Sequence, residues 1–407
     1  MGRDRAYCGN VGGMYVGMIW NVVRILIMAL LVLGSARRAL AQTTPQAPPD
    51  PPKEPSKLLD RLKEPDQGGG VHLTKHFAIV FGGIKSGSGI ALGPAVSHKA
   101  ANGAYTQIKA VYSVKKFALL QARYDSRPFW SQRATLTSRL RWQDAPKLRV
   151  FRLGPDAPDL SVDYTERKTE GSARLRMQLT RKYRMASGLG IERYVTTGGR
   201  IDLTEKDTLP EVPPLPGLAT NPWFVHAFVS AAADTRTSPD YSRTGHLLEA
   251  AIHSFTDVHD GQDAFGRFEG TAQQLIPTHG GKGVIDLSAQ TWLSLSDGLR
   301  SVPFFLMPTL GGSNYLRAYP SYRFRDRHAV FLRGEYRWAV HTMLDVAGLL
   351  EAGKVAPTVG GLRLSNMAES IGVGVRVHTK TSSLVDLDVA HGRDGFKFTI
   401  GFNSGGS

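Results

Sequence analysis

The chain has 407 residues, with 50 Lys and Arg against 35 Asp and Glu, and a formal net charge of +15 at pH 7. Hydrophobic residues make up 42% and charged residues 21% of it, which excludes a helical membrane bundle because each of its spans needs about 20 consecutive apolar residues. A transmembrane β-barrel stays compatible with this composition, since only every second residue of its strands faces lipid.

The N-terminal region carries the pattern of an export signal. Residues 25–34 form a short apolar run that follows Arg24 and precedes the small-x-small pair Ala39 and Ala41. This order is typical of a cleaved secretory signal, and the run is too short for a comfortable bilayer span. We therefore expect a signal peptide over residues 1–41, cleaved near Ala41, with translation starting at Met1, Met14 or Met18.

Residues 42–74 are rich in proline and charge and cannot bury enough apolar surface to fold alone. They are expected to form an extended periplasmic tether. The one cysteine, Cys8, precedes the cleavage site, so the mature chain should contain no disulfide.

Two-residue alternation of apolar and polar side chains recurs from residue 75 to residue 403, and it predicts strands rather than helices. We expect an all-β fold, a transmembrane antiparallel β-barrel of about 16 strands over residues 75–403, followed by a tail at 404–407. The predicted strands are Gly89–Ser97, Ala104–Val114, Phe117–Asp125, Ala134–Trp142, Ala173–Thr180, Met185–Tyr194, Trp223–Ala233, His246–Thr256, Phe265–Leu275, Val284–Ser294, Pro303–Pro308 and five more after Val330. Residues 77–83 are either one more strand or an extension of the first.

The last predicted strand has the clearest alternation. Its apolar face carries Phe396, Phe398, Ile400 and Phe402, which alternate with polar residues and glycine. A soluble sandwich also alternates, but here charged residues oppose apolar ones on strand after strand in a chain with an export signal. That combination favours a barrel with apolar side chains on lipid and polar ones in the lumen.

The positive charge does not indicate nucleic-acid binding, because the basic residues are spread along strands rather than clustered with aromatic residues. A basic lumen that faces anionic lipid headgroups or unfolded clients fits better. No spacing of His and acidic residues resembles a hydrolase or zinc site. We expect no enzyme activity, no cofactor and no metal site.

An aromatic and basic segment, residues 310–327, interrupts the strand pattern five strands before the end. Within it, Leu316, Arg317, Ala318 and Tyr319 resemble the V/I-R-G-F/Y signature of the bacterial surface-antigen barrels. That superfamily includes outer-membrane assembly factors of the BamA and TamA type and the two-partner secretion transporters.

The resemblance implies that this loop folds back into the lumen and that its arginine pairs with an acid on the second strand after the loop. Leu349, Glu351 and Gly353 occupy the corresponding F/G-x-D-x-G positions, with Glu335 near them on the adjacent strand. Arg317 should then donate to Glu351. Three residues depart from the family pattern: Ala318 stands for glycine, Glu351 for aspartate and Leu349 for the aromatic residue.

The family also implies a function, to which there are two alternatives. The leading hypothesis is insertion or translocation of proteins or lipids at the outer membrane, through a weak seam between the first strand near Gly89 and the last strand. Outer-membrane lipid including lipopolysaccharide, unfolded client proteins and a separate periplasmic partner are the expected partners, because too few residues precede the barrel for the family's POTRA domains. An anion-favouring channel and a structural surface-antigen barrel are the alternatives.

Overall fold

The computed structural model describes residues 70–157, 161–198, 215–258, 264–296 and 302–402, all within one compact unit that spans residues 48–407. The expected signal peptide (1–41), most of the expected tether (42–74) and the tail (404–407) lie outside the described residues. Across the described segments, no helix is both long and apolar enough to cross a membrane.

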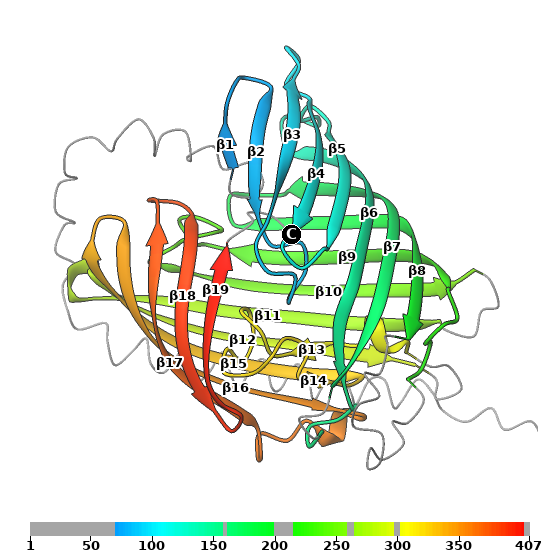
Figure 1. Ribbon diagram of the computed structural model, residues 1–407. Coiled ribbons are helices and arrows are strands. Elements are labelled where there is room, and N and C mark those ends of the chain that lie inside the picture. Colours follow the sequence, from blue (N-terminus) through cyan, green and yellow to red (C-terminus); the bar gives the residue numbers. More distant parts are fainter. Residues whose placement is uncertain (1–69, 158–160, 199–214, 259–263, 297–301, 403–407) are drawn as a thin grey trace, which may run out of the picture. The chain divides into compact units, whose positions relative to one another are not determined.

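One antiparallel sheet of seventeen strands dominates the structure (Figure 1). Its first nine strands are β1 (Gly70–His72), β2 (Phe77–Gly82), β3 (Ala91–Lys99), β4 (Tyr105–Ser113), β5 (Ala118–Asp125), β6 (Ala134–Phe151), β7 (Ser161–Gln178), β8 (Tyr183–Gly198) and β9 (Trp223–Asp234). The next eight are β10 (Gly245–Asp257), β11 (Phe265–Thr278), β12 (Gly283–Leu295), β15 (His328–His341), β16 (Leu344–Ala356), β17 (Ala368–His378), β18 (Ser383–Gly392) and β19 (Gly395–Phe402). The other elements are the short strands β13 (Thr309–Leu310) and β14 (Phe324–Arg325) and the 3₁₀ turns η2 (His279–Gly281), η3 (Phe304–Leu306) and η4 (Val359–Gly361).

The structure confirms the all-β class and the expected number of about sixteen long strands, which are β2 to β12 and β15 to β19. One predicted strand is absent, and residues 77–82 form a separate strand in its place in the count. The predicted strand Pro303–Pro308 contains the 3₁₀ turn η3 instead, because prolines at both ends remove the amide donors that a sheet ladder needs. The first long strand is β2, at residues 77–82, so Gly89 lies in the β2–β3 connection. The sheet itself begins at Gly70, inside the expected tether.

Each long strand pairs with the next along the chain, from β2 to β19. The short strand β1 pairs with the edge of β2 that faces away from β3, with Val71 opposite Ile79. Among the described residues, no residue of β19 is paired with a residue of β1 or β2. We call this unclosed junction the seam, with β1 and β2 at one edge and β19 at the other.

Side chains alternate across the sheet as the sequence pattern predicts. On β16, Asp345 and Glu351 are buried on the inner face, whereas Val346 and Leu350 are 42% and 62% exposed on the outer face. Exposed apolar side chains on an outer face suit contact with lipid tails, and polar inner residues suit a lumen.

The connections differ at the two ends of the barrel. We call the end from which residues 296–327 leave β12 the hairpin end. It also carries the long connection 199–222, whereas the opposite end has short turns such as those between β15 and β16 and between β17 and β18. Figure 1 shows the β13–β14 segment lying inside the space that the curled sheet surrounds rather than beyond the ends of the strands.

Candidate functional site

The segment with the family signature forms a hairpin inside the lumen. β13 and β14 pair through Thr309 with Arg325 and Leu310 with Phe324, and we call residues 309–325 the lumen hairpin. Leu316 has φ 49°, in the left-handed region that non-glycine residues seldom adopt. The left-handed residue of the signature is therefore Leu316, and the motif's glycine position, Ala318, does not have a positive φ.

Arg317 lies against Glu351 of β16, as the resemblance implied. Its backbone N–H donates to Glu351 Oε2 at 2.7 Å, and its Nη1 donates to Glu351 Oε1 at 2.8 Å. The two side chains are 5% and 0% exposed. A buried, charge-assisted pair with two hydrogen bonds fixes both the position and the direction of the hairpin tip.

The ionic network around this pair is wider than the sequence motif indicates. Arg317 Nε also lies 3.1 Å from Asp388 Oδ2 of β18, and Arg376 of β17 lies 2.7 Å from the other Asp388 oxygen. Glu335 is 3.9 Å from Arg317 but 2.9 Å from Arg376, so its main partner is Arg376. Alternation places Asp388 and Arg376 on the inner face, but the motif gave no reason to select them.

Apolar packing holds the hairpin next to this network. Leu310, Leu316 and Phe324 are at most 2% exposed, in a cluster that includes Val355 of β16. A Cβ built on Gly353 would lie 2.7 Å from Leu310 Cδ1 and 3.2 Å from Leu316 Cδ1. The glycine of the wall motif thus lets the hairpin approach β16. The predicted wall residue Leu349 is buried on the same face of the strand, outside this cluster.

The hairpin contacts the β19 edge of the seam. The Tyr319 hydroxyl accepts a hydrogen bond from the backbone N–H of Arg393 at 3.1 Å, and the Tyr319 carbonyl accepts one from Lys397 of β19. Arg323 donates to Asp394 in the β18–β19 turn at 2.8 Å. These bonds join the tip of the hairpin to the final two strands.

The hairpin also contacts the connection that follows β2. Ser86, in the β2–β3 connection, donates through its hydroxyl to Ser321 Oγ at 2.9 Å. The Tyr322 hydroxyl donates to the carbonyl of Ser86 at 2.9 Å. Burial, with Tyr164 and Glu166 nearby, raises the pKa of Tyr322 well above its usual range, so the hydroxyl keeps the proton that it donates. The lumen hairpin therefore joins β19, one edge of the seam, to the connection that follows β2 at the other edge.

The predicted seam strand presents its apolar side chains outward. Phe396, Phe398 and Ile400 are 79%, 59% and 41% exposed. The backbone of Phe402 pairs with Val385, but its side chain lies outside the described residues.

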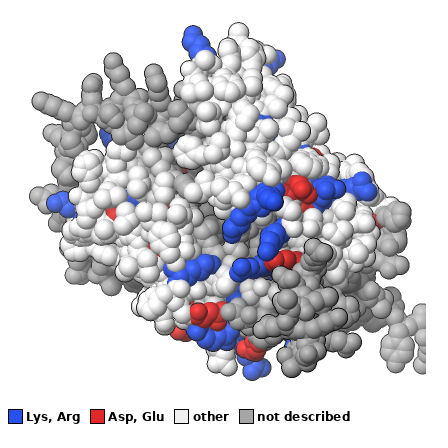
Figure 2. All heavy atoms as spheres, in the orientation of Figure 1, with Lys and Arg blue, Asp and Glu red and all other residues white. Residues whose placement is uncertain are grey.

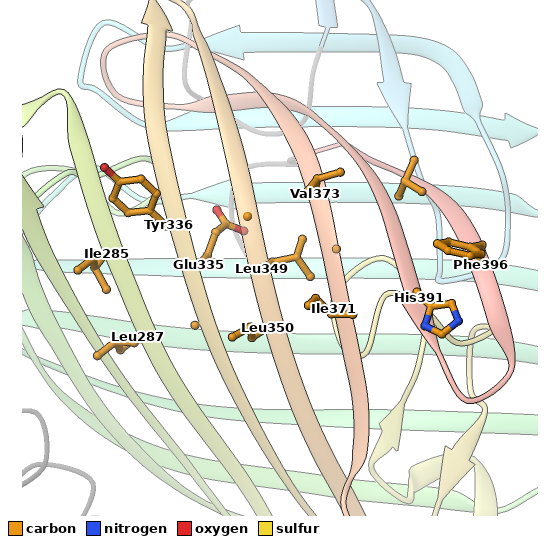
Figure 3. A pocket seen from close by; sticks show the side chains of 14 residues that line it. Ile285, Leu287, Glu335, Tyr336, Leu349, Leu350, Ile371, Val373, His391 and Phe396 are labelled. Carbon is orange, nitrogen blue, oxygen red and sulfur yellow. The ribbon is translucent and has the colours of Figure 1, made fainter.

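A shallow apolar groove crosses the outer face next to the seam strands (Figure 3). It runs from Leu287 across Leu350 and Ile371 to His391 and Phe396, and its floor includes the outward-facing glycines 334 and 348. The groove is on the face that carries the exposed apolar residues. It is therefore part of the lipid-facing wall rather than of the lumen.

Charge is concentrated where the surface is hollowed. Figure 2 shows Lys and Arg gathered around the hollow in the middle of the view, whereas the flanks are mostly uncharged. No group of three or more His, Cys, Asp and Glu in the described segments is arranged to hold a metal ion.

The fold and the hairpin can be compared with known proteins. Residues 102–403 match the family model described as the Omp85 superfamily domain. The chain belongs to the Omp85 superfamily. This match covers most of the sheet and all of the lumen hairpin, and it confirms the resemblance to the surface-antigen and assembly-factor barrels.

Solved structures with a similar fold match across most of the chain. BamA from Haemophilus ducreyi lacking POTRA domains 1–3 matches with a TM-score of 0.59 and 14% identity, over 81% of this chain and 70% of that chain. CdiB from Escherichia coli matches with a TM-score of 0.51 and 12% identity, over 82% and 62% of the two chains. CdiB from Acinetobacter baumannii matches with a TM-score of 0.50 and 10% identity, over 80% and 58%.

At these identities the likeness to the solved structures concerns the fold alone. A comparison with curated protein sequences finds no significant match. Membership in the Omp85 superfamily supports an outer-membrane β-barrel from a family of insertion and translocation factors.

Proposed function

We propose that this Omp85 barrel assists the insertion or translocation of proteins or lipids at the outer membrane, without enzymatic chemistry. The observation that carries the proposal is the bridge made by the lumen hairpin, which contacts Ser86 in the β2–β3 connection and Lys397 of β19. A passive pore needs no internal loop that joins the last strand to the connection after the first long strand.

The seam supplies a way to engage a client. An edge strand presents unpaired backbone N–H and C=O groups that can pair with a strand from another chain. In our proposal β19 offers such an edge to a client strand, and the hairpin holds β18 and β19 in place until the client engages. The exposed residues Phe396 and Phe398 keep that edge in the lipid phase.

The proposal also fixes an orientation and a set of partners. We propose that residues 1–41 direct export and are removed near Ala41, and that the tether lies in the periplasm. The hairpin end then faces outward, because long connections of bacterial barrels are extracellular. Outer-membrane lipid including lipopolysaccharide, unfolded client proteins and a separate periplasmic partner remain the proposed partners.

The first test removes the anchor of the hairpin. Glu351→Gln and Arg317→Gln would be produced in a strain without the native protein, and folded outer-membrane proteins and surface lipopolysaccharide would be quantified. We expect both variants to lower client levels while the barrel itself stays in the outer membrane. Unchanged client levels in well-folded variants would refute the proposal.

A second test locks the hairpin to one edge. The Oγ atoms of Ser86 and Ser321 are 2.9 Å apart, so Ser86→Cys with Ser321→Cys places two thiols within reach of a disulfide in an oxidising compartment. We expect the oxidised double variant to lose client assembly and to regain it on reduction. Each single variant serves as the matched control.

A second candidate function, an anion-favouring channel, is supported by the basic side chains that line the lumen. Planar-bilayer recording distinguishes the two. Large, steady, anion-selective conductance steps would favour a channel, whereas small flickering steps fit a barrel filled by its hairpin.

A further inference from the structure

Five basic side chains on β4, β6 and β7 form a surface on the inner wall, far along the sheet from the network around Arg317. We call this surface the basic wall. It consists of Lys109, Arg139, Arg141, Arg174 and Arg176. Their places in the two-residue alternation put them on the inner face, opposite outward residues such as Ile108 and Leu140, which are 53% and 67% exposed.

The strand registers bring these five residues together. Lys109 faces Gln121, which faces Arg141 on the next strand. Arg139 pairs with Ser172, two positions from Arg174 on the same face. The charge of Lys109 is close enough to those of Arg139 and Arg141 to be repelled by them, and the charge of Arg174 is close enough to those of Arg139 and Arg176. The five cations therefore repel one another across one continuous surface.

The nearby carboxylates are already paired with other cations. Asp125 is 2.9 Å from Arg123, and Glu170 is 3.0 Å from Lys168. Glu249 is 2.9 Å from Arg184. Among the described residues, none of the five basic side chains has an acidic group within ion-pair distance.

Several donors of the basic wall also lack hydrogen-bond acceptors. The Nε atoms of Arg139, Arg141 and Arg174 are buried, and none has a partner among the described residues. Buried donors are usually satisfied, and each exception requires an explanation. An anion that accepts hydrogen bonds from several guanidinium groups would compensate both the missing acceptors and the mutual repulsion.

The basic wall lies toward the end of the barrel opposite the hairpin. Arg176 faces Thr135, next to the first residue of β6, and Arg174 faces Thr137. The lumen hairpin instead contacts Asp394 and Ser86 at the hairpin end. A ligand that enters from the opposite end thus meets the basic wall before it meets the hairpin.

We infer that the basic wall is a binding site for phosphate-bearing ligands that carry more than one negative charge. Guanidinium groups bind phosphate through two parallel hydrogen bonds, and several arginines on adjacent strands can bind several phosphate oxygens at once. The ligand chemistry is that of a phosphorylated lipid headgroup or a free polyphosphate. The inference goes beyond the proposed function and does not rest on it, since neither the seam nor Arg317 takes part.

The test measures binding to the purified full chain in detergent micelles by isothermal titration calorimetry. One arm uses inorganic tripolyphosphate, a second uses a water-soluble short-chain phosphatidic acid, and a third uses poly-glutamate. The variant Arg139→Gln with Arg174→Gln removes two charges from the basic wall. The matched control, Arg167→Gln with Arg193→Gln, removes two exposed arginines from the outward faces of β7 and β8.

We expect tripolyphosphate to bind the native chain and the control equally, and the double variant about tenfold or more weakly, because charge-assisted hydrogen bonds are lost. Arg176→Gln, at an exposed position, should weaken binding by a smaller factor and keeps the test valid if the double variant fails to fold. Binding of the phosphatidic acid as well assigns the site to lipid headgroups, whereas binding of tripolyphosphate alone assigns it to free phosphates.

Three results would overturn the inference. The first is that neither phosphate probe binds the native chain. The second is that both phosphate probes bind the double variant as tightly as they bind the native chain. The third is that poly-glutamate alone binds. The last result would assign the basic wall to an acidic polypeptide.

Discussion

Gly392 of β18 and Ala318 of the lumen hairpin are so close that a Cβ built on Gly392 would lie 2.9 Å from the Cβ of Ala318. The family signature has glycine where this chain has Ala318. The alanine is accommodated because the left-handed backbone is at Leu316, and because the wall opposite it is a glycine. The space in the contact is thus provided by the wall rather than by the hairpin.

Gly353→Ala should loosen the hairpin. The added Cβ would meet Leu310 Cδ1 at 2.7 Å, and overpacking of this kind costs about 1–3 kcal/mol. Limited proteolysis of the hairpin and denaturant unfolding in detergent measure the effect. Gly348→Ala on the same strand, with nothing within 4 Å of its Cβ, should leave both unchanged, and an equal effect there would contradict the packing argument.

Glu351→Gln should destabilise the barrel because Arg317 would keep its buried charge without its best partner. Removing one partner of a buried ion pair costs about 3–5 kcal/mol. The cost is smaller here because Asp388, 3.1 Å from Arg317, still compensates part of the arginine's charge. The free energy of unfolding followed by tryptophan fluorescence measures the loss. Replacing both partners, with Arg317→Met and Glu351→Leu, should restore part of it, and a double variant less stable than the single one would refute this account.

Tyr241→Phe should weaken the β9–β10 turn at the opposite end of the barrel. The Tyr241 hydroxyl donates to Asp345, and its ring stacks on His378 with centroids 4.0 Å apart. Phenylalanine keeps the stacking and loses the hydrogen bond, so we expect a loss of about 1 kcal/mol. Tyr241→Ala should cost about 3–5 kcal/mol.

The loss in Tyr241→Phe should depend on pH in one direction. Burial raises the pKa of Tyr241, and the hydrogen bond to Asp345 raises it further. A group with a raised folded pKa contributes its full stability below its unfolded pKa, about 10 for tyrosine. The difference between native and variant unfolding free energies should be constant below about pH 10 and shrink above it. A difference that grows with rising pH would rule out the donor role of the hydroxyl.

Phe398→Arg should destabilise the barrel in phospholipid vesicles. Phe398 is 59% exposed on the outer face, and an arginine on the lipid face of a barrel costs about 2–4 kcal/mol at the midplane. Phe398→Leu keeps the apolar character and should be close to neutral. Equal stabilities for the two variants would argue against contact of this face with lipid.

The alternation along the chain predicted most strands because the two faces of each strand meet different surroundings. It failed at residues 303–308, where Phe304 and Met307, which lie between two prolines, are buried inside the lumen rather than paired in the sheet. It also left residues 77–83 undecided between a separate strand and an extension. Local periodicity cannot distinguish an apolar segment that packs inside a barrel from one that faces lipid.

The contact between Arg317 and Glu351 followed from the resemblance to the family, since the spacing of motif and wall residue is preserved. Asp388, Arg376 and Ser86 joined the site only through the fold. Each is one polar residue among many on an inner face or in a connection, and no local pattern marks those that a hairpin from another part of the chain will contact.

The sequence by itself determined the class of fold, the outward apolar faces and the arginine and acid that anchor the hairpin. These depend on residue periodicity and on one motif, which are local properties. Only the tertiary structure decided that Ala318 lies against Gly392 and that the hairpin joins β19 to the β2–β3 connection. Those contacts join residues from distant strands, and their geometry depends on how the whole sheet curls around the lumen.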